Sequence, residues 1–203
     1  MSVVPQTRPS LLLRLRDTRD SDAWTDFVRL YTPLIFRYCQ RLGLQEADAA
    51  DVAQEVMRVA SHQLPAFHYD VARGKFRGWL LQTTRHRVRQ WIARRQRAPE
   101  PVEGETLERL LEPMAAADED GRWEDDYRQR VFDWAADKAR GEFQTSTWEA
   151  FWRTASNSVS VKEVATQLGI SVGAVYIARS RVTARLRELI ETVTEESIAN
   201  WQD

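Results

Sequence analysis

Positive charge without any carboxylate is concentrated in one segment of the chain. Residues 71–99 contain nine Lys or Arg and no Asp or Glu, although the whole chain of 203 residues has a formal net charge of −1. Phe76, Trp79 and Trp91 are set among these cations. Cations hold the phosphates of a nucleic acid, and aromatic rings stack on its bases. The segment therefore predicts a surface that binds nucleic acid.

A second nucleic-acid signal lies near the other end of the chain. The sequence predicts a short helix from Val161, a turn at Gly169 and a longer helix from Val172. Ser160 and Ser171 are suited to cap these helices, and Gly169 supplies the positive φ that the turn needs. The longer helix carries cations with no carboxylate before Glu188, namely Arg179, Arg181, Arg185 and Arg187. This order predicts a helix-turn-helix that offers the start of its second helix to base edges; a helical hairpin with solvated arginines is the alternative.

Helical spacing of apolar residues predicts the elements that carry the basic segment. Residues 20–42 form one helix bent at Pro33 or a pair of helices, 48–64 form another, and 76–96 form a long basic helix. The cations expected to face outward on the basic helix are Arg77, Arg85, Arg89 and Arg95.

The same spacing predicts the core of the C-terminal part. One helix begins near Trp123, and the next buries the aromatic side chains Trp148, Phe151 and Trp152. The inner stripe expected for the last helix comprises Val172, Val175, Val182, Leu186 and Leu189.

An acidic segment separates the two helical parts. Residues 98–126 contain eleven Asp or Glu against two Arg, and such a composition cannot bury enough apolar surface to order itself well. The sequence thus predicts an all-α protein of two small helical domains joined by an acidic linker. The expected divisions are an N-terminal extension at 1–19, a first domain at 20–97, the linker at 98–122, a second domain at 123–192 and a tail at 193–203.

The single cysteine and the N-terminus bear on the cellular compartment. One cysteine, Cys39, excludes an internal disulfide framework and any cysteine-based zinc site. Phe36 and Tyr38 beside it favour a buried, inert thiol over a reactive one. The N-terminus has no apolar signal region, and the apolar run at 11–15 is too short to span a bilayer. We therefore expect a soluble, cytoplasmic chain with no membrane partner.

Residue order gives no motif for catalysis. No Ser/His/Asp arrangement, phosphate loop or HExxH run occurs, and His62, His68 and His86 lack metal-ligand spacing. Carboxylates at 118–120 and 124–126 suggest a metal-dependent nuclease, but the expected linker offers no rigid frame for a cation. The sequence predicts no enzyme activity, no cofactor and no metal.

Three runs of residues together resemble the sigma-70 family in its small extracytoplasmic-function type. Asp51-Val-Ala-Gln54-Glu55-Val56 is similar to the D-x-x-Q-E-hydrophobic run of the second sigma region. A second run is similar to the basic helix of that region. It consists of Phe76-Arg-Gly-Trp79-Leu80, Arg85 and Trp91-Ile-Ala-Arg94-Arg95. The helix-turn-helix of the fourth region is resembled by Gly169-Ile-Ser-Val-Gly173-Ala-Val175 and the arginines after it.

The resemblance implies that the first domain binds core RNA polymerase and opens promoter DNA at the −10 element. Asp51, Gln54 and Glu55 would meet the coiled coil of the β′ subunit. Two carboxylates and an amide on one helical face match a basic partner helix; a solvated polar face is the alternative. The implied −10 contacts are Phe67, His68, Tyr69, Lys75, Arg77, Arg85, His86 and Arg89. The first three would stack on or pocket an unpaired base, unless their loop is pinned to its own core.

The resemblance also implies that the second domain reads the −35 element and touches the β flap. The implied −35 contacts are Ser171, Val172, Ala174, Tyr176, Arg179, Arg181 and Arg185. Tyr176-Ile177-Ala178 stands where many family members have more polar residues. The implied partners are core RNA polymerase and promoter DNA, with an anti-sigma factor as a further candidate.

Two other classes of protein compete with this interpretation. A stand-alone helix-turn-helix regulator would bind duplex DNA as a dimer, but it has no need of the runs at 51–56 and 76–95. A pure protein-interaction adaptor has no need of a basic helix without carboxylates. The sequence therefore favours a sigma factor.

Overall fold

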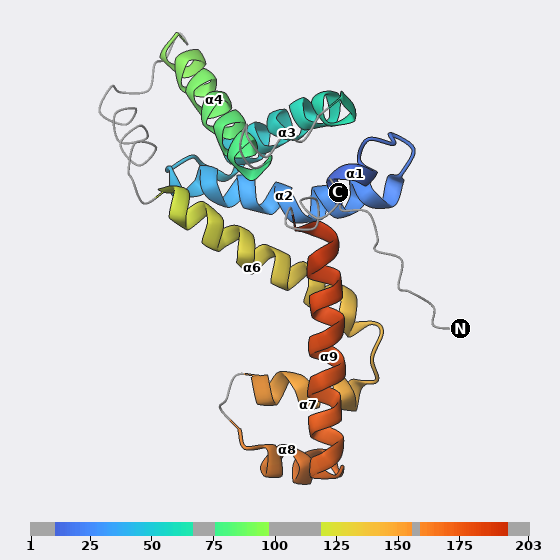
Figure 1. Cartoon of the computed structure of the whole chain (residues 1–203). Helices are drawn as coiled ribbons and strands as arrows, with labels where there is room; N and C mark the ends of the chain where they lie inside the picture. The colour runs from blue at the N-terminus through green and yellow to red at the C-terminus, as the bar shows by residue number, and fades with distance from the viewer. Residues whose placement is uncertain (1–10, 67–75, 98–118, 156–158, 195–203) are drawn as a thin grey trace. The chain divides into compact units, whose positions relative to one another are not determined.

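The computed structural model describes residues 11–66, 76–97, 119–155 and 159–194. Every regular element in these ranges is a helix (Figure 1), so the predicted all-α fold is confirmed for this part of the chain. Contacts divide the chain into two compact units: the first runs to Arg130, and the second is Val131–Thr194. None of the described helices is long and apolar enough to cross a bilayer.

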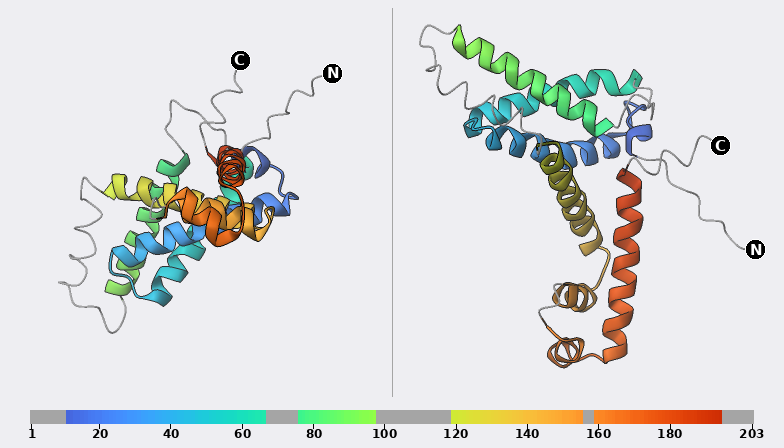
Figure 2. Two further views of the ribbon diagram at one scale, coloured as in Figure 1. Left: turned by 90° about the horizontal axis from the view of Figure 1, so that it is seen from below. Right: turned by 60° about the vertical axis from the view of Figure 1, so that its left-hand side comes forward.

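Three long helices form the frame of the first unit. They are α2 (Ser21–Arg41), α3 (Glu46–Gln63) and α4 (Phe76–Gln96), accompanied by the short α1 (Leu11–Arg14) and the 3-10 turn η1 (Leu64–Ala66). α3 packs against both α2 and α4, which can be followed in Figure 2. The long α6 (Glu119–Arg140) crosses the division between the units, so its residues 119–130 belong to the first unit.

α2 runs through Pro33 as one helix and not as a pair. The Asp20 carboxylate accepts a hydrogen bond from the backbone N–H of Ala23 at 2.9 Å, which caps the first turn. Pro33 has no N–H to donate to the carbonyl of Arg29, four residues earlier. The guanidinium of Arg130 donates to that carbonyl oxygen at 3.2 Å. A side chain of α6 thus replaces the backbone donor that the proline removes.

Aromatic rings join the start of α6 to α2 within the first unit. Tyr31 stacks on Tyr127 with ring centroids 5.9 Å apart, and Tyr38 meets Trp123 edge-on at 5.6 Å. Trp123 is only 1% exposed. Large rings buried in this way remove much apolar surface from water, so they hold residues 119–130 of α6 on the first unit.

The beginning of α6 therefore differs from its predicted place. The sequence put residues 119–122 in the linker and Trp123 at the start of the second domain, whereas the structure places all of them in the first unit. The density of carboxylates masked a helical signal, because Trp123 and Tyr127 are four residues apart and lie on one face.

The second unit contains the remainder of α6 and the helices α7 (Thr145–Ala155), α8 (Val161–Leu168) and α9 (Val172–Val193). α7 and α8 both pack against α9 (Figure 1). Their shared core consists of small and β-branched residues, namely Ala150, Val164, Ala165, Val175 and Ala178. Small side chains at these positions let the helices approach closely.

The turn between α8 and α9 has the predicted local structure. Ser160 accepts a hydrogen bond from the N–H of Glu163 at 3.2 Å, and Ser171 accepts one from the N–H of Ala174 at 3.1 Å. Gly169 ends α8 with φ 64°, in the left-handed region that glycine tolerates. The predicted order of capped helix, turn and capped helix is therefore observed.

One residue of α7 that was expected in the core lies at the surface. Trp152 is 49% exposed, so the prediction of its burial was wrong. Its ring stacks on Trp148, with centroids 5.7 Å apart, and on Phe132, at 6.3 Å. Helical spacing could not distinguish this surface stack from a core position, because both use large apolar residues at the same period.

The buried Cys39 of α2 should be chemically inert in the folded chain. Burial raises the pKa of its thiol to about 12, and only the thiolate is nucleophilic. At pH 8 we expect alkylation by iodoacetamide to be roughly a thousandfold slower than for a free thiol of ordinary pKa. The rate should still rise with pH beyond pH 9, where an ordinary thiol levels off. Mass spectrometry of timed samples measures the rate, and fast alkylation without denaturant would show that the thiol is accessible.

Candidate protein-binding and nucleic-acid surfaces

One side of α3 carries the three polar residues that the sequence singled out. Asp51 and Gln54 are exposed, and the side chain of Glu55 keeps 30% of its surface in water. Val52 and Val56 are buried. Because the polar residues are three and four positions apart, they share one helical face. The structure thus brings them together, and Glu55 is the least exposed of the three.

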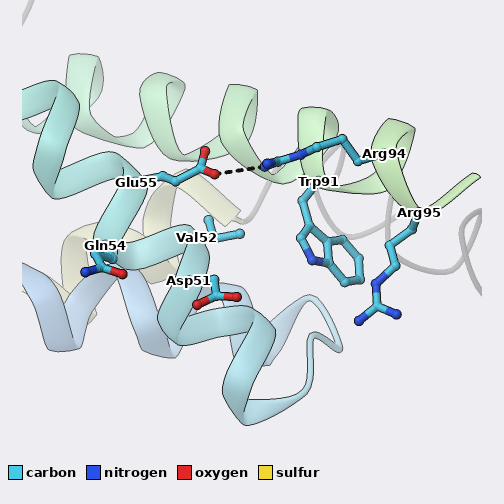
Figure 3. Close-up of a pocket in the computed structure, with 7 residues that line it drawn as sticks. All are labelled: Asp51, Val52, Gln54, Glu55, Trp91, Arg94 and Arg95. Carbon is cyan, nitrogen blue, oxygen red and sulfur yellow. Dashed lines mark hydrogen bonds and ion pairs between the residues drawn. The ribbon is translucent and has the colours of Figure 1, made fainter. Parts of the chain in front are cut away.

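A pocket of about 360 Å³ lies beside this face, between α3 and α4 (Figure 3). Its walls combine carboxylates, an amide, an aliphatic side chain, an indole and two guanidinium groups. The lining residues are Asp51, Val52, Gln54, Glu55, Trp91, Arg94 and Arg95. Both family-like runs of the first unit, at 51–56 and at 91–95, therefore meet at a single surface.

Ion pairs and hydrogen bonds fix the α4 wall of the pocket. Arg94 Nη2 donates to Glu55 Oε1 at 3.0 Å, and Arg95 Nη2 donates to Asp48 Oδ1 at 2.9 Å. The indole Nε1 of Trp91 donates to the same Asp48 oxygen at 3.2 Å. Charges of both signs therefore alternate across the surface. The sequence did not assign Trp91, Arg94 or Arg95 to the polymerase contact, because only the tertiary structure places them beside α3.

Two arginines expected to face outward on α4 are buried, so that prediction was wrong. Arg77 and Arg85 are 7% and 8% exposed. Arg77 forms an ion pair with Glu124 at 3.1 Å, and its guanidinium lies over the ring of Tyr127, 4.4 Å from the centroid. Buried charges require such partners because desolvation would otherwise be costly.

Arg85, which lies further along α4, is held in the same way. Its Nη2 donates to Asp120 Oδ1 at 2.7 Å, and its Nε donates to Tyr38 Oη at 3.2 Å. Burial alone would lower the pKa of this guanidinium, but the hydrogen bonds with Tyr38 and Asp120 raise it above its ordinary value. Arg85 therefore stays charged within the packed interior of the first unit.

The other residues predicted to contact the −10 element fall into two groups. His86 and Arg89 are exposed on α4, as expected, and the His86 ring lies 2.9 Å from the Gln90 amide nitrogen. Phe67, His68, Tyr69 and Lys75 lie outside the described residues.

Much of the positive charge on α4 already has an internal partner. Residues 76–97 contain seven arginines. Four of them form ion pairs with carboxylates of α3 or α6, namely Arg77, Arg85, Arg94 and Arg95. The carboxylates of Asp120, Glu124 and Asp126, which a nuclease would need for a cation, pair instead with arginines.

The start of α9 is the second candidate surface. Ser171 and Arg181 are exposed there, and Ala174 and Arg179 are half-buried. The exposed apolar residues at this end are Val172, Tyr176 and Ile177. Val172 was expected in the inner stripe, but it lies in the first turn, ahead of the packed core that begins at Val175. Ile177 was not among the predicted contact residues.

Arg185 of α9 is engaged within the second unit. Its guanidinium donates to both carboxylate oxygens of Glu142, at 2.6 and 2.7 Å, and to Glu188 Oε2 at 3.0 Å. These hydrogen bonds raise the pKa of Arg185, with Glu142 the larger cause. Arg185 thus fastens α9 to the loop after α6, and it would have to leave Glu142 before it could hold a phosphate.

Comparison with known proteins gives a family match within the first unit. Residues 27–98 match the family model of sigma-70 region 2. A comparison with curated proteins gives no match. Among solved structures, CnrH in complex with the cytosolic domain of CnrY is similar at 22% sequence identity and a TM-score of 0.36, over 91% of this chain and 97% of that one.

The region 2 match covers most of α2 and all of α3 and α4, the helices that carry both motif runs of the first unit. It thereby confirms the resemblance found in the sequence for this part of the chain. Residues 27–98 thus match sigma-70 region 2.

The burial of Arg77 leads to a test of its role. Arg77→Ala should lower the free energy of unfolding by about 1–3 kcal/mol, because Glu124 and Tyr127 lose their partner. Arg89→Ala removes an exposed cation from the same helix and should change it by about 0.5 kcal/mol or less. Denaturant titration followed by circular dichroism measures both. Equal, small effects would show that Arg77 does not support the fold.

Proposed function

We propose that this chain is a sigma factor of the extracytoplasmic-function type, which binds core RNA polymerase and directs it to promoters. The observation that carries the proposal is a sigma-70 region 2 domain in which Asp51 and Gln54 are exposed beside Glu55 on one face of α3. The helix-turn-helix of the second unit supports it, because promoter choice needs an element that docks on duplex DNA.

The face of α3 and the adjacent pocket form the proposed contact for the β′ coiled coil. Asp51 and Gln54 supply exposed acceptors, and Val52 supplies an apolar wall. Arg94 adds a cation beside Glu55. A partner helix with basic side chains opposite Asp51 and an acidic one near Arg94 would complement this pattern, and complementary charge favours specific association.

The proposed −10 surface is the exposed side of α4 with the segment that precedes it. His86 and Arg89 are the contacts on α4, and Phe67, His68, Tyr69 and Lys75 are the contacts before it. Arg77 and Arg85 are assigned a different role from the one first expected. Each already has a carboxylate partner, so they position α4 and do not themselves hold phosphate.

The proposed −35 surface is the start of α9, where Ser171, Val172, Ala174 and Tyr176 would meet the DNA. Arg179 and Arg181 follow one turn later and are suited to the flanking phosphates. On the family resemblance, we include the β flap and an anti-sigma factor as further partners. The mechanism is recognition and strand opening by binding energy, without catalysis by this chain.

A stand-alone regulator remains the second candidate, because the helix-turn-helix would serve it equally well. Run-off transcription with purified core RNA polymerase separates the two functions. A sigma factor should produce defined transcripts only when core enzyme and this chain are both present. Tight, sequence-specific duplex binding by the chain alone, with no association with the polymerase, would establish the regulator.

Exposure of the α3 face predicts a separation of partner binding from folding. The double variant Asp51→Ala with Gln54→Ala should change the free energy of unfolding by about 0.5 kcal/mol or less. Its binding to core RNA polymerase should weaken by about 2 kcal/mol, which is the usual loss at an interface hot spot. Calorimetric unfolding and a fluorescence binding assay measure the two effects.

Gln63→Ala is the matched control for this variant. Gln63 is an exposed amide on the same helix, about two and a half turns beyond Gln54 and hence on the other side. The control variant Gln63→Ala should leave polymerase binding unchanged. A steep loss of stability in the double variant would instead make Asp51 and Gln54 structural residues.

A further inference from the structure

The first two turns of α9 present apolar side chains to solvent. Val172, Tyr176 and Ile177 are 38%, 57% and 61% exposed. They make up most of the large apolar residues that lie exposed in the described part of the chain. Val175 and Ala178, from the same two turns, are buried in the core of the second unit. The exposed residues are therefore surplus to the packing of α9.

These two turns also lack the side chains that usually read bases. Residues 172–178 read VGAVYIA and contain no Arg, Lys, Asn, Gln, Asp, Glu, Ser or Thr. Hydrogen-bonded readout in the major groove depends on those residue types, whereas the apolar feature of a base edge is the methyl group of thymine. An apolar helix start therefore matches thymine better than any other base.

Gly173 lies between the exposed residues and is itself exposed. A Cβ added there would meet only the Oγ of Ser171, at 3.8 Å. Packing within the chain therefore does not require glycine at this position. The missing side chain leaves the helix backbone open to close approach by a ligand.

The surrounding charges favour DNA as the occupant of this surface. Arg179 and Arg181 follow on α9, where the next carboxylate is Glu188. On α8, Lys162 and Glu163 are exposed and their charges offset each other. Apolar contacts at the helix start, followed by cations, fit a helix whose first turns enter the groove while its later turns pass the phosphates.

We propose that α9 selects its DNA site through thymine methyl groups, which pack against Val172, Tyr176 and Ile177. The inference rests on the proposed function, because it requires that the helix-turn-helix docks on duplex DNA. It adds the base that is selected and names Ile177 as a residue that determines the choice.

The test replaces thymine by deoxyuridine, which lacks only the methyl group. Full-length chain with core RNA polymerase first selects preferred sites from a library of random duplexes. Each thymine of the selected −35 site is then replaced singly by deoxyuridine, and the dissociation constant of the protein–duplex complex is measured. Loss of one buried methyl group should weaken binding about fourfold at each contacted thymine. Replacement of thymines outside the selected site should have no effect.

Protein variants connect that loss to the apolar surface. Each of the variants Tyr176→Ala and Ile177→Ala should lose the discrimination at one contacted position or more. At that position the variant should bind the thymine duplex and the deoxyuridine duplex equally tightly. Val28→Ala is the matched control, since Val28 is a similarly exposed apolar residue on α2. It should keep the full discrimination. The measurement on the unaltered protein needs no variant and stands even if a variant folds poorly.

Three results would overturn the proposal. The first is that duplexes with deoxyuridine bind the unaltered protein as tightly as duplexes with thymine at every position of a well-defined selected site. The second is that both variants keep the discrimination between thymine and deoxyuridine that the unaltered chain shows. The third is that the variants lose association with the polymerase while base discrimination persists, which would make the surface a protein contact. Absence of any selected duplex and of run-off transcripts would refute the proposed function itself, and this inference with it.

Discussion

Pairing of arginines with carboxylates is the interaction on which the first unit depends. Arg77 and Arg85 lie on the buried side of α4, where an unpaired guanidinium would cost several kcal/mol. Their partners, Glu124 and Asp120, come from the start of α6. The burial of Trp123 supports the same contact from the apolar side. α4 and residues 119–130 of α6 must therefore fold together, which explains why the first unit extends to Arg130 and not to the end of α4.

The course of α4 was predictable, but the face that it buries was not. Its bounds, Phe76–Gln96, agree with the sequence prediction because helix propensity and apolar spacing are local properties. Arg77 and Arg85 were wrongly expected on the solvent face of this helix. Their partners lie 47 and 35 residues further along the chain, within a stretch whose composition resembles a linker. No local pattern connects residues at such separations, so only the tertiary structure could reverse the assignment.

The candidate surfaces show the same division between local and distant information. Asp51 and Gln54 were correctly placed on an exposed face, because i and i+3 positions share a side of any helix. The pocket beside them needs Arg94 from a helix distant in sequence, so it was missed. In the second unit, the caps at Ser160 and Ser171 follow from nearby residues and were predicted. The apolar period wrongly placed Val172 in the inner stripe, whereas the family resemblance implied a DNA contact there. A residue in the first turn can continue the apolar period without reaching the core.

The internal ion pairs also determine how the first unit should respond to ionic strength. A solvated arginine that meets a phosphate releases condensed cations from the nucleic acid, and this release makes affinity fall as salt rises. An arginine that exchanges a tethered carboxylate for a phosphate leaves that carboxylate in need of a cation from solution. The release and the uptake then nearly cancel. Glu124 and Asp120 thus act as built-in counterions for Arg77 and Arg85. Even a complex that separated these pairs would gain little salt dependence from them, and the dependence would come from Arg89 and the other cations outside the pairs.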